Sequence, residues 1–201
     1  MKRTKEAALI TRKQIIERAV ELFLQKGFSV TTLDEIAKRS DVTRGAIYWH
    51  FSDKLDILNE LIDTQHEDLS QLLSDLFNSG TSTLEGIEGI IEEIVTHFFE
   101  TKSFQDFIEL TLFKIEYAQL VKLKTTKTEL TEYFIRNFRH VIKEAQHTGH
   151  VLSDIDANDV AITITSMING MYRLYFILPD QVQSKESAMR AFTSYLKLLT
   201  P

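Results

Sequence analysis

The sequence predicts an all-α protein of about nine helices, and three observations lead to this fold class. Apolar residues recur every three or four positions along most of the 201 residues, which is the spacing of one helix face. No segment shows the sustained alternation of apolar and polar residues that a half-buried strand requires. The two prolines, Pro179 and Pro201, lie late in the chain, so no proline ring interrupts a helix before residue 179.

A long helix followed by a short one is expected at the start of the N-terminal quarter. The long helix covers roughly residues 9–26 and ends where Gly27 can take the left-handed conformation. Thr32 and Glu35 have the spacing of a capping box, in which each side chain satisfies a free backbone donor of the first turn. They therefore open a short second helix, which stops near Ser40.

Seven more helices complete the predicted fold. Thr43 can cap a short third helix through Trp49, and Asp53 can cap a long fourth helix that continues to about residue 78. The other five are indicated by apolar stripes, and their approximate ranges are 87–99, 104–117, 130–149, 156 or 159 to 178, and 184–199.

Charge is distributed unevenly along the chain. The formal net charge is −6, but residues 1–58 hold 11 Lys and Arg against 8 Asp and Glu, which leaves 12 against 21 for the rest. The N-terminal part is therefore +3 (11 − 8) and the remainder is −9 (12 − 21). A basic head on an acidic body is typical of a protein that binds nucleic acid through the head, although a solvated helix face gives the same count.

The sequence lacks the residues or motifs that several functional classes require. The absence of cysteine excludes disulfides, thiolate zinc sites and cysteine nucleophiles, and it suits a cytoplasmic protein. No apolar run is long enough for a signal segment or a membrane span, so we expect no membrane partner. The phosphate-binding, dinucleotide-binding, zinc-protease and serine-hydrolase motifs are also missing.

We therefore expect no catalytic residue, no metal and no cofactor. His147 and His150 straddle Gly149, and this arrangement favours capping of a helix end over metal binding. A helical enzyme with an unrecognised carboxylate or histidine site is the competing interpretation, because two carboxylates from distant segments can meet in space.

The second and third predicted helices have the arrangement of a helix-turn-helix. They are joined by a short polar turn and follow a longer supporting helix, which places the third helix in the major groove of DNA. Ala46, Ile47 and Phe51 can pack inward from this region. The residues left outside offer hydrogen-bond donors, flat rings or a close backbone approach, and they are Thr43, Arg44, Gly45, Tyr48, Trp49, His50 and Lys54.

A family pattern runs through the first 54 residues. Its segments are Thr11-Arg12 through Gly27, Thr32-Leu33, Glu35-Ile36-Ala37, and Val42-Thr-Arg-Gly-Ala-Ile-Tyr-Trp-His-Phe51 with Lys54. Together they resemble the DNA-binding domain of the TetR family of transcriptional repressors, in its branch of AcrR-like and TtgR-like regulators of multidrug efflux operons. The resemblance implies a helix-turn-helix DNA-binding domain at residues 1–52 and a ligand-binding and dimerisation domain at residues 53–201.

The resemblance also implies roles for individual residues in DNA binding. The residues expected to hold phosphates are Thr32, Thr43, Tyr48, His50 and Lys54. Arg44 and Gly45 would meet base edges, and Trp49 would contact either the DNA backbone or thymine methyl groups.

An apolar ligand cavity in the body is a further implication of the resemblance. The corresponding positions are His66, Leu69, Ile90, Ile94, Ile108, Leu112, Phe134, Phe138 and Ile168. The 13 phenylalanines of the chain can supply flat walls, so the expected small-molecule inducers are amphipathic aromatic compounds, with cationic ones among them. Ordinary core packing is the alternative for any one of these residues.

The last two predicted helices carry more apolar residues than one packed face requires, which predicts a homodimer. The expected interface residues are Ala161, Ile164, Tyr175, Phe192 and Leu196, and the alternative is that they are buried in their own body. The sequence as a whole predicts a ligand-responsive repressor that binds a palindromic operator as a homodimer and controls a multidrug efflux operon. The alternative function is an all-α dimeric interaction protein that does not bind DNA.

Overall fold

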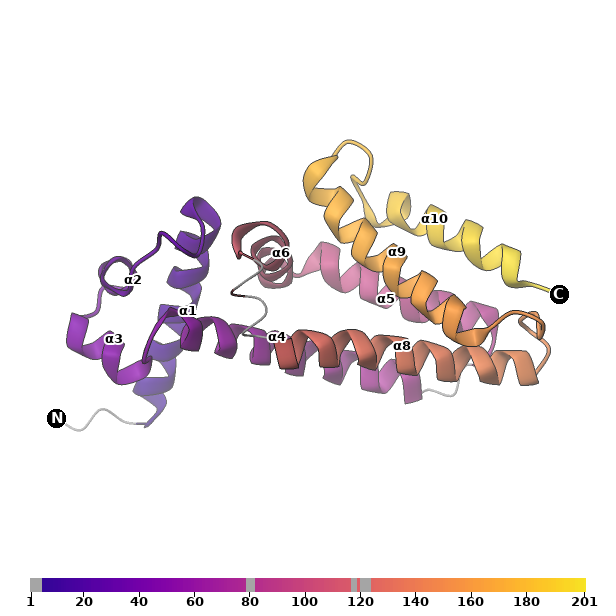
Figure 1. Ribbon diagram of the computed structural model, residues 1–201, viewed down its shortest axis with the longest axis horizontal. Coiled ribbons are helices and arrows are strands. Elements are labelled where there is room, and N and C mark those ends of the chain that lie inside the picture. Colours follow the sequence, from indigo (N-terminus) through magenta and orange to yellow (C-terminus); the bar gives the residue numbers. More distant parts are fainter. Residues whose placement is uncertain (1–4, 79–81, 117–118, 120–123) are drawn as a thin grey trace. The chain divides into compact units, whose positions relative to one another are not determined.

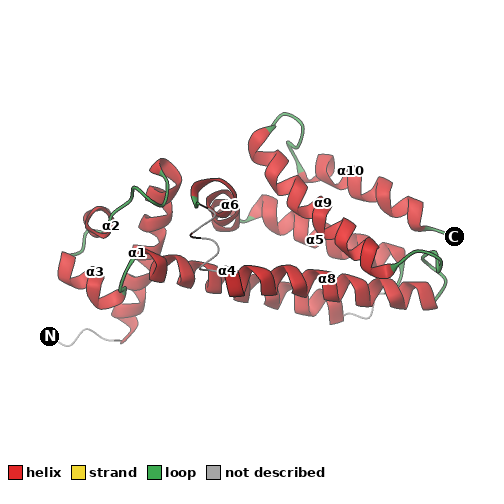
Figure 2. Cartoon of the chain, viewed as in Figure 1, coloured by secondary structure: helices red, strands yellow, loops and turns green. Residues whose placement is uncertain are grey.

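The structure is a computed structural model that describes residues 5–78, 82–116, 119 and 124–201. All regular structure in these ranges is helical (Figure 1 and Figure 2), which confirms the predicted all-α fold. The described ranges contain nine α-helices, of which α1 to α6 are Lys5–Lys26, Leu33–Arg39, Arg44–His50, Lys54–Asn78, Leu84–Glu100 and Lys102–Glu109. The remaining α-helices are α8 Lys124–His147, α9 Ala157–Ile177 and α10 Lys185–Leu196, and the short helices are η1 Leu110–Lys114 and η2 Lys197–Leu199.

The helices form two compact units. Unit 1 comprises residues 1–65 and 106–124, and unit 2 comprises residues 66–105 and 125–201. The boundary predicted between residues 52 and 53 is a functional division and stays a prediction. Unit 1 extends beyond that boundary, because it includes the first half of α4 and the segment that contains η1.

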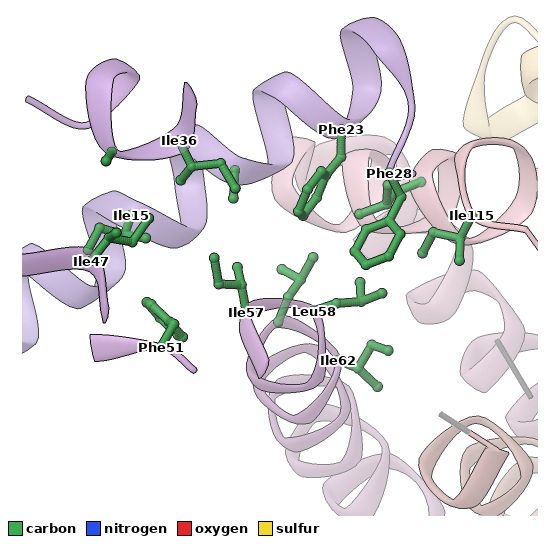
Figure 3. Close-up of a cluster of buried hydrophobic side chains, with 14 residues drawn as sticks. Ile15, Phe23, Phe28, Ile36, Ile47, Phe51, Ile57, Leu58, Ile62 and Ile115 are labelled. Atoms are coloured by element: carbon green, nitrogen blue, oxygen red, sulfur yellow. The ribbon is translucent and has the colours of Figure 1, made fainter. Parts of the chain in front are cut away.

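Unit 1 is built around an apolar core between α1, α2, α3, the start of α4 and the segment after α6. Figure 3 shows this core, in which ten of the buried side chains are labelled: Ile15, Phe23, Phe28, Ile36, Ile47, Phe51, Ile57, Leu58, Ile62 and Ile115. Gly27 ends α1 with a φ of 94°, a left-handed conformation that glycine adopts without steric cost. The chain therefore turns sharply after α1, and Phe28 packs against Phe23 with ring centres 5.0 Å apart.

The segment predicted as one helix over 104–117 is broken in the structure. α6 ends at Glu109 and continues as a single π-helical turn, η1, after which Ile115 is extended. Leu110 and Ile115 are both buried in the core of unit 1. Positions five apart in a regular α-helix lie about 140° apart around its axis, so the wider turn and the extended residue let both side chains reach one core.

Unit 2 contains α5, the end of α4, and the helices α8 to α10. Side-chain caps define three of its helix starts: Thr83 accepts from Gly86 N at 3.1 Å, Asp156 from Asn158 N at 2.7 Å, and Ser184 from Ser187 N at 3.3 Å. α10 lies along α5, where Lys185 Nζ is 2.8 Å from the carboxylate of Glu92.

Candidate nucleic-acid interface

The two short helices of unit 1 are fixed by local hydrogen bonds. Thr32 Oγ1 accepts from Glu35 N at 3.2 Å, and Thr32 N donates to Glu35 Oε2 at 2.9 Å, which confirms the predicted capping box. Thr43 Oγ1 accepts from Ala46 N at 3.1 Å and so begins α3. Between them Asp41 has a φ of 55°, a left-handed conformation that short polar side chains tolerate.

The outer face of α3 carries large side chains that are widely exposed. Tyr48 exposes 49% of its surface and Trp49 exposes 69%, while Ile47 on the opposite face is fully buried. A Cβ atom placed on Gly45 would meet no heavy atom within 4 Å, so the backbone is open to a close approach from outside. Exposed aromatic rings next to accessible backbone are typical of a surface that binds a partner.

Arg44 lies on the same exposed face and has only weak attachments. Its Nε is 3.2 Å from Asp34 Oδ1, and its guanidinium carbon is 5.8 Å from the centre of the Tyr48 ring. A hydrogen bond with Tyr48, followed by the charge of Asp34, raises the pKa of Arg44 above its usual value. Exposed ion pairs contribute little to stability, so Arg44 can exchange Asp34 for another acceptor, such as a guanine edge.

Thr32 and Thr43 are exposed, as their predicted contacts with phosphates require, but both hydroxyls already cap a helix. Thr32 Oγ1 also donates its proton to Glu35 Oε2 at 2.8 Å. Hydrogen bonds from Lys26 and from Thr32 lower the pKa of Glu35 to about 2, so its carboxylate remains ionised and continues to accept this proton. The capping role of both threonines is established, and their phosphate contacts stay predictions.

The side chain of His50 is buried, with 7% of its surface exposed, which argues against the predicted phosphate contact. Its ring lies edge-on to that of Trp49, with centres 4.6 Å apart. Its main-chain oxygen accepts a hydrogen bond from Arg12, whose Nε also donates to Glu60 at 2.6 Å. Sequence reasoning did not assign a role to Arg12, which joins α1 to the end of α3 and to α4.

Lys54 is also held inside unit 1. Its Nζ donates to the main-chain oxygens of Phe28 at 2.8 Å and Ser29 at 2.9 Å. Burial of the ammonium group lowers the pKa of Lys54 from its usual value, and it is the largest influence on that pKa. Phe28 N in turn donates to Lys114 O at 3.1 Å, so the loop after α1 is bonded both to the start of α4 and to the end of η1. Two of the three ammonium donors of Lys54 are therefore committed, and its phosphate contact stays a prediction.

The nine predicted ligand-binding residues divide between the units. Ile108 and Leu112 belong to unit 1, and the other seven belong to unit 2. Within unit 2, all except the half-buried His66 are buried, and the Phe134 and Phe138 rings stack with centres 6.3 Å apart. Burial is common to cavity walls and to ordinary core, so their role in ligand binding stays a prediction.

The single chain leaves four of the five predicted dimer residues little surface for a partner. Ala161, Ile164, Phe192 and Leu196 are buried within the single chain, as the alternative interpretation expected. The apolar residues that α9, the following loop and η2 do expose are Ile162, Leu174, Ile177, Leu178 and Leu198. Tyr175 is half-buried, with its ring 5.0 Å from that of Phe98. Burial within the single chain favours the alternative interpretation for these four residues, and the predicted interface stays a prediction.

The described residues contain neither a metal-binding cluster nor a membrane-spanning helix. No group of three or more histidine, aspartate or glutamate residues there is arranged to hold a metal ion, and the imidazole of His150 instead lies 2.9 Å from Thr148 Oγ1. None of the described helices is long and apolar enough to cross a membrane.

Comparison with known proteins gives a consistent result. Residues 15–61 match the model of the tetR family of bacterial regulatory proteins. The chain is 30% identical over 173 residues to the probable acrEF/envCD operon repressor of Escherichia coli K12, covering 85% of this chain and 78% of that protein. It is 27% identical over 184 residues to the transcriptional regulator TtgR of Pseudomonas putida, covering 90% of this chain and 88% of that protein.

Among solved structures, the complex of SmeT with triclosan matches with a TM-score of 0.82 at 21% identity, covering 96% of this chain and 92% of that one. SmeT is the repressor of the multidrug efflux pump SmeDEF of Stenotrophomonas maltophilia. At this identity the match shows a shared fold.

Proposed function

This chain belongs to the TetR family of bacterial regulatory proteins, and from that premise we propose that it represses transcription by binding operator DNA through α3. The observation that carries the proposal is the exposed face of α3, where Arg44, Gly45, Tyr48 and Trp49 lie together. A helix of this kind presents its side chains to base edges and phosphates when it lies in the major groove.

The proposed signal is a small molecule bound in unit 2, and the proposed target is a multidrug efflux operon. The Escherichia coli relative is named as the repressor of the acrEF/envCD operon, and SmeT was solved with triclosan bound. The aromatic core of unit 2 gives this idea a physical basis, because flat rings accommodate amphipathic aromatic compounds of different shapes.

Two helical segments can transmit the signal. α4 and the segment formed by α6 and η1 each begin in one unit and end in the other. At its unit 1 end, η1 holds the loop after α1 through the bond from Phe28 N to Lys114 O. A ligand that prefers the DNA-released state by about 5.5 kcal/mol would shift operator occupancy from nearly full to nearly empty.

A homodimer is the proposed operator-binding form, with the exposed face of α9 as the contact. Ile162, Leu174 and Ile177 are exposed there and lie within a sector of about 120° at 100° per residue. A two-fold axis would pair this face with its copy and so bury both apolar stripes. A dimer also matches the two half-sites of a palindromic operator.

The direct test is fluorescence anisotropy with labelled DNA from the region upstream of the protein's own gene. The wild-type protein should bind it with salt-dependent affinity, and Tyr48→Ala should bind it more weakly at unchanged helix content by circular dichroism. Equal affinity of the two proteins for this DNA would contradict the proposed interface. A folded dimer that binds no upstream DNA would favour the interaction-protein alternative.

A further inference from the structure

A buried hydroxyl group without a partner lies in an aromatic cluster of unit 2. We call this the Phe98 cluster, and its members are Phe98, Phe99, Phe104, Tyr172, Tyr175 and Phe176. Tyr172 exposes only 6% of its surface, and its Oη has no hydrogen-bond partner among the described residues. Burial accordingly raises the pKa of this phenol.

The two rings that contact Tyr172, those of Phe98 and Phe104, offer no hydrogen-bonding group. The Phe98 ring is tilted by 34° against it, with centres 4.7 Å apart, and the Phe104 ring lies edge-on at 5.9 Å. A buried polar group that gives up water without gaining a partner disfavours the folded state. Phenylalanine would fill the same space without this cost, so packing alone does not account for the hydroxyl.

The Phe98 cluster extends from a buried end to a half-exposed end. Phe98, Phe104 and Tyr172 are buried, whereas Phe99, Tyr175 and Phe176 are half-exposed. Within the described part of unit 2, no aspartate, glutamate, lysine or arginine is buried. A ligand at the buried end would therefore meet flat apolar rings and one phenol, with no buried counter-charge for a charged group.

We infer that Tyr172 is the hydrogen-bonding residue of the small-molecule site, and that this site takes uncharged, flat aromatic molecules with a hydroxyl or carbonyl group. The ligand stacks against the Phe98 cluster, and its polar group bonds to Tyr172 Oη. This inference rests on the proposed function, since it adds a recognition residue to the ligand site of unit 2. Ile168, one of the predicted ligand-binding residues, precedes Tyr172 by one turn of α9, so the two lie on one face of that helix.

The test compares two probes of nearly equal shape, 2-naphthol and 2-methylnaphthalene, by calorimetric titration without DNA. Tyr172→Phe removes only the hydroxyl, and Tyr195→Phe, at a half-buried position of α10 outside the Phe98 cluster, is the matched control. Tyr172→Phe should weaken 2-naphthol binding about three- to tenfold and leave 2-methylnaphthalene binding unchanged, because only 2-naphthol can form the bond. Tyr195→Phe should bind both probes as the wild-type protein does.

The melting temperature of the unliganded protein supplies an independent readout. Tyr172→Phe should melt at the wild-type temperature or above it, because the hydroxyl it removes is unpaired. A lower melting temperature, an equal loss of affinity for both probes, or a wild-type protein that binds neither probe would overturn the inference. Operator binding is measured separately by anisotropy, so a failure of the proposed repressor function would appear there and not in the probe titrations.

Discussion

Lys54 holds Phe28 at two points, because its Nζ donates to the main-chain oxygen at 2.8 Å while the ammonium lies 4.8 Å from the centre of the phenyl ring. The first bond satisfies a carbonyl in the loop after α1, and the second contact is a cation–π interaction. The start of α4 is thereby attached to the end of α1. Lys54, which the family resemblance assigns to DNA binding, therefore also stabilises unit 1 by joining α4 to the loop after α1.

Replacing Lys54 by methionine should destabilise unit 1. Lys54→Met keeps an apolar stem of similar length but leaves two carbonyls without this donor, so the free energy of unfolding should fall by about 1–3 kcal/mol. Urea unfolding followed by circular dichroism measures this change. Lys38→Met, at an exposed position of α2, should change stability by no more than about 0.5 kcal/mol.

A different outcome for Lys54→Met would show that Lys54 acts in DNA binding. In that case Lys54→Met would retain wild-type stability, weaken binding to all DNA sequences alike and reduce the salt slope of binding by about one.

Arg44 should carry sequence preference. Arg44→Ala should cost about 1–3 kcal/mol of operator binding and reduce the discrimination between the operator and single-base variants of it. Arg39→Ala is the matched control, because Arg39 is also exposed and paired, with Glu21 at 3.0 Å. Anisotropy titrations over a set of variant operators measure the effect. A uniform loss for every sequence would make Arg44 a phosphate contact instead.

Helix starts were predictable because their signals are local. The hydroxyl of Thr32 and the carboxylate of Glu35 lie three residues apart, and Thr43 caps a backbone N–H three residues later. Both partners of each hydrogen bond lie three residues apart, so the sequence pattern reveals the bond. Most of the outer face of α3 followed from the helical spacing of its apolar residues, but His50, which was expected on that face, is buried.

Features that depend on distant segments were not predictable in this way. His50 is buried where Arg12, from α1, bonds to its main-chain oxygen, and Lys54 is held by carbonyls that lie 25 and 26 residues away. On α9 both faces carry apolar residues, such as the buried Ile164 and the exposed Leu174. Periodicity identifies such a helix, but only the packed structure shows which face remains open.

The exposed face of α9 should hold the dimer together. Leu174 exposes 44% of its surface, so Leu174→Arg can place its charge in water in the monomer, whereas the dimer would have to bury it unpaired. Sedimentation velocity at micromolar concentration should show a dimer for the wild-type protein and a monomer for Leu174→Arg, with equal helix content. Gln183→Arg, at an exposed position between α9 and α10, is the control and should remain dimeric.

Phe192→Arg tests whether Phe192 lies in a dimer interface, as the sequence predicts, or in the core of its own chain. Phe192 is buried within its own chain, so the charged side chain should unfold unit 2 rather than release a folded monomer. A folded Phe192→Arg monomer would instead support the interface that the sequence predicts, with Phe192 in it.

The stability of unit 2 should fall between about pH 7.5 and pH 5.5, and His97 is the residue responsible. Burial lowers the pKa of His97 from its usual value of 6.5, against a smaller opposing effect of Asp68. As the pH falls through 6.5, the unfolded chain therefore binds a proton that the folded chain does not. The contribution of His97 to stability is fully present well above this pH and is lost as the pH falls through it. One proton limits the slope to about 1.4 kcal/mol per pH unit.

His97→Gln isolates this effect. The variant keeps a polar group near Thr101, whose Oγ1 lies 3.3 Å from His97 Nδ1, but it cannot titrate. Urea unfolding at pH 7.5, 6.5 and 5.5 should give a shallower pH dependence for His97→Gln than for the wild-type protein, and His140→Gln, at an exposed position of α8, is the control for loss of an imidazole. Carboxylates with lowered pKa values, such as Glu35 at about 2, lose their contribution only below about pH 4.5. Parallel pH curves for the wild-type protein and His97→Gln would show that another group produces the slope.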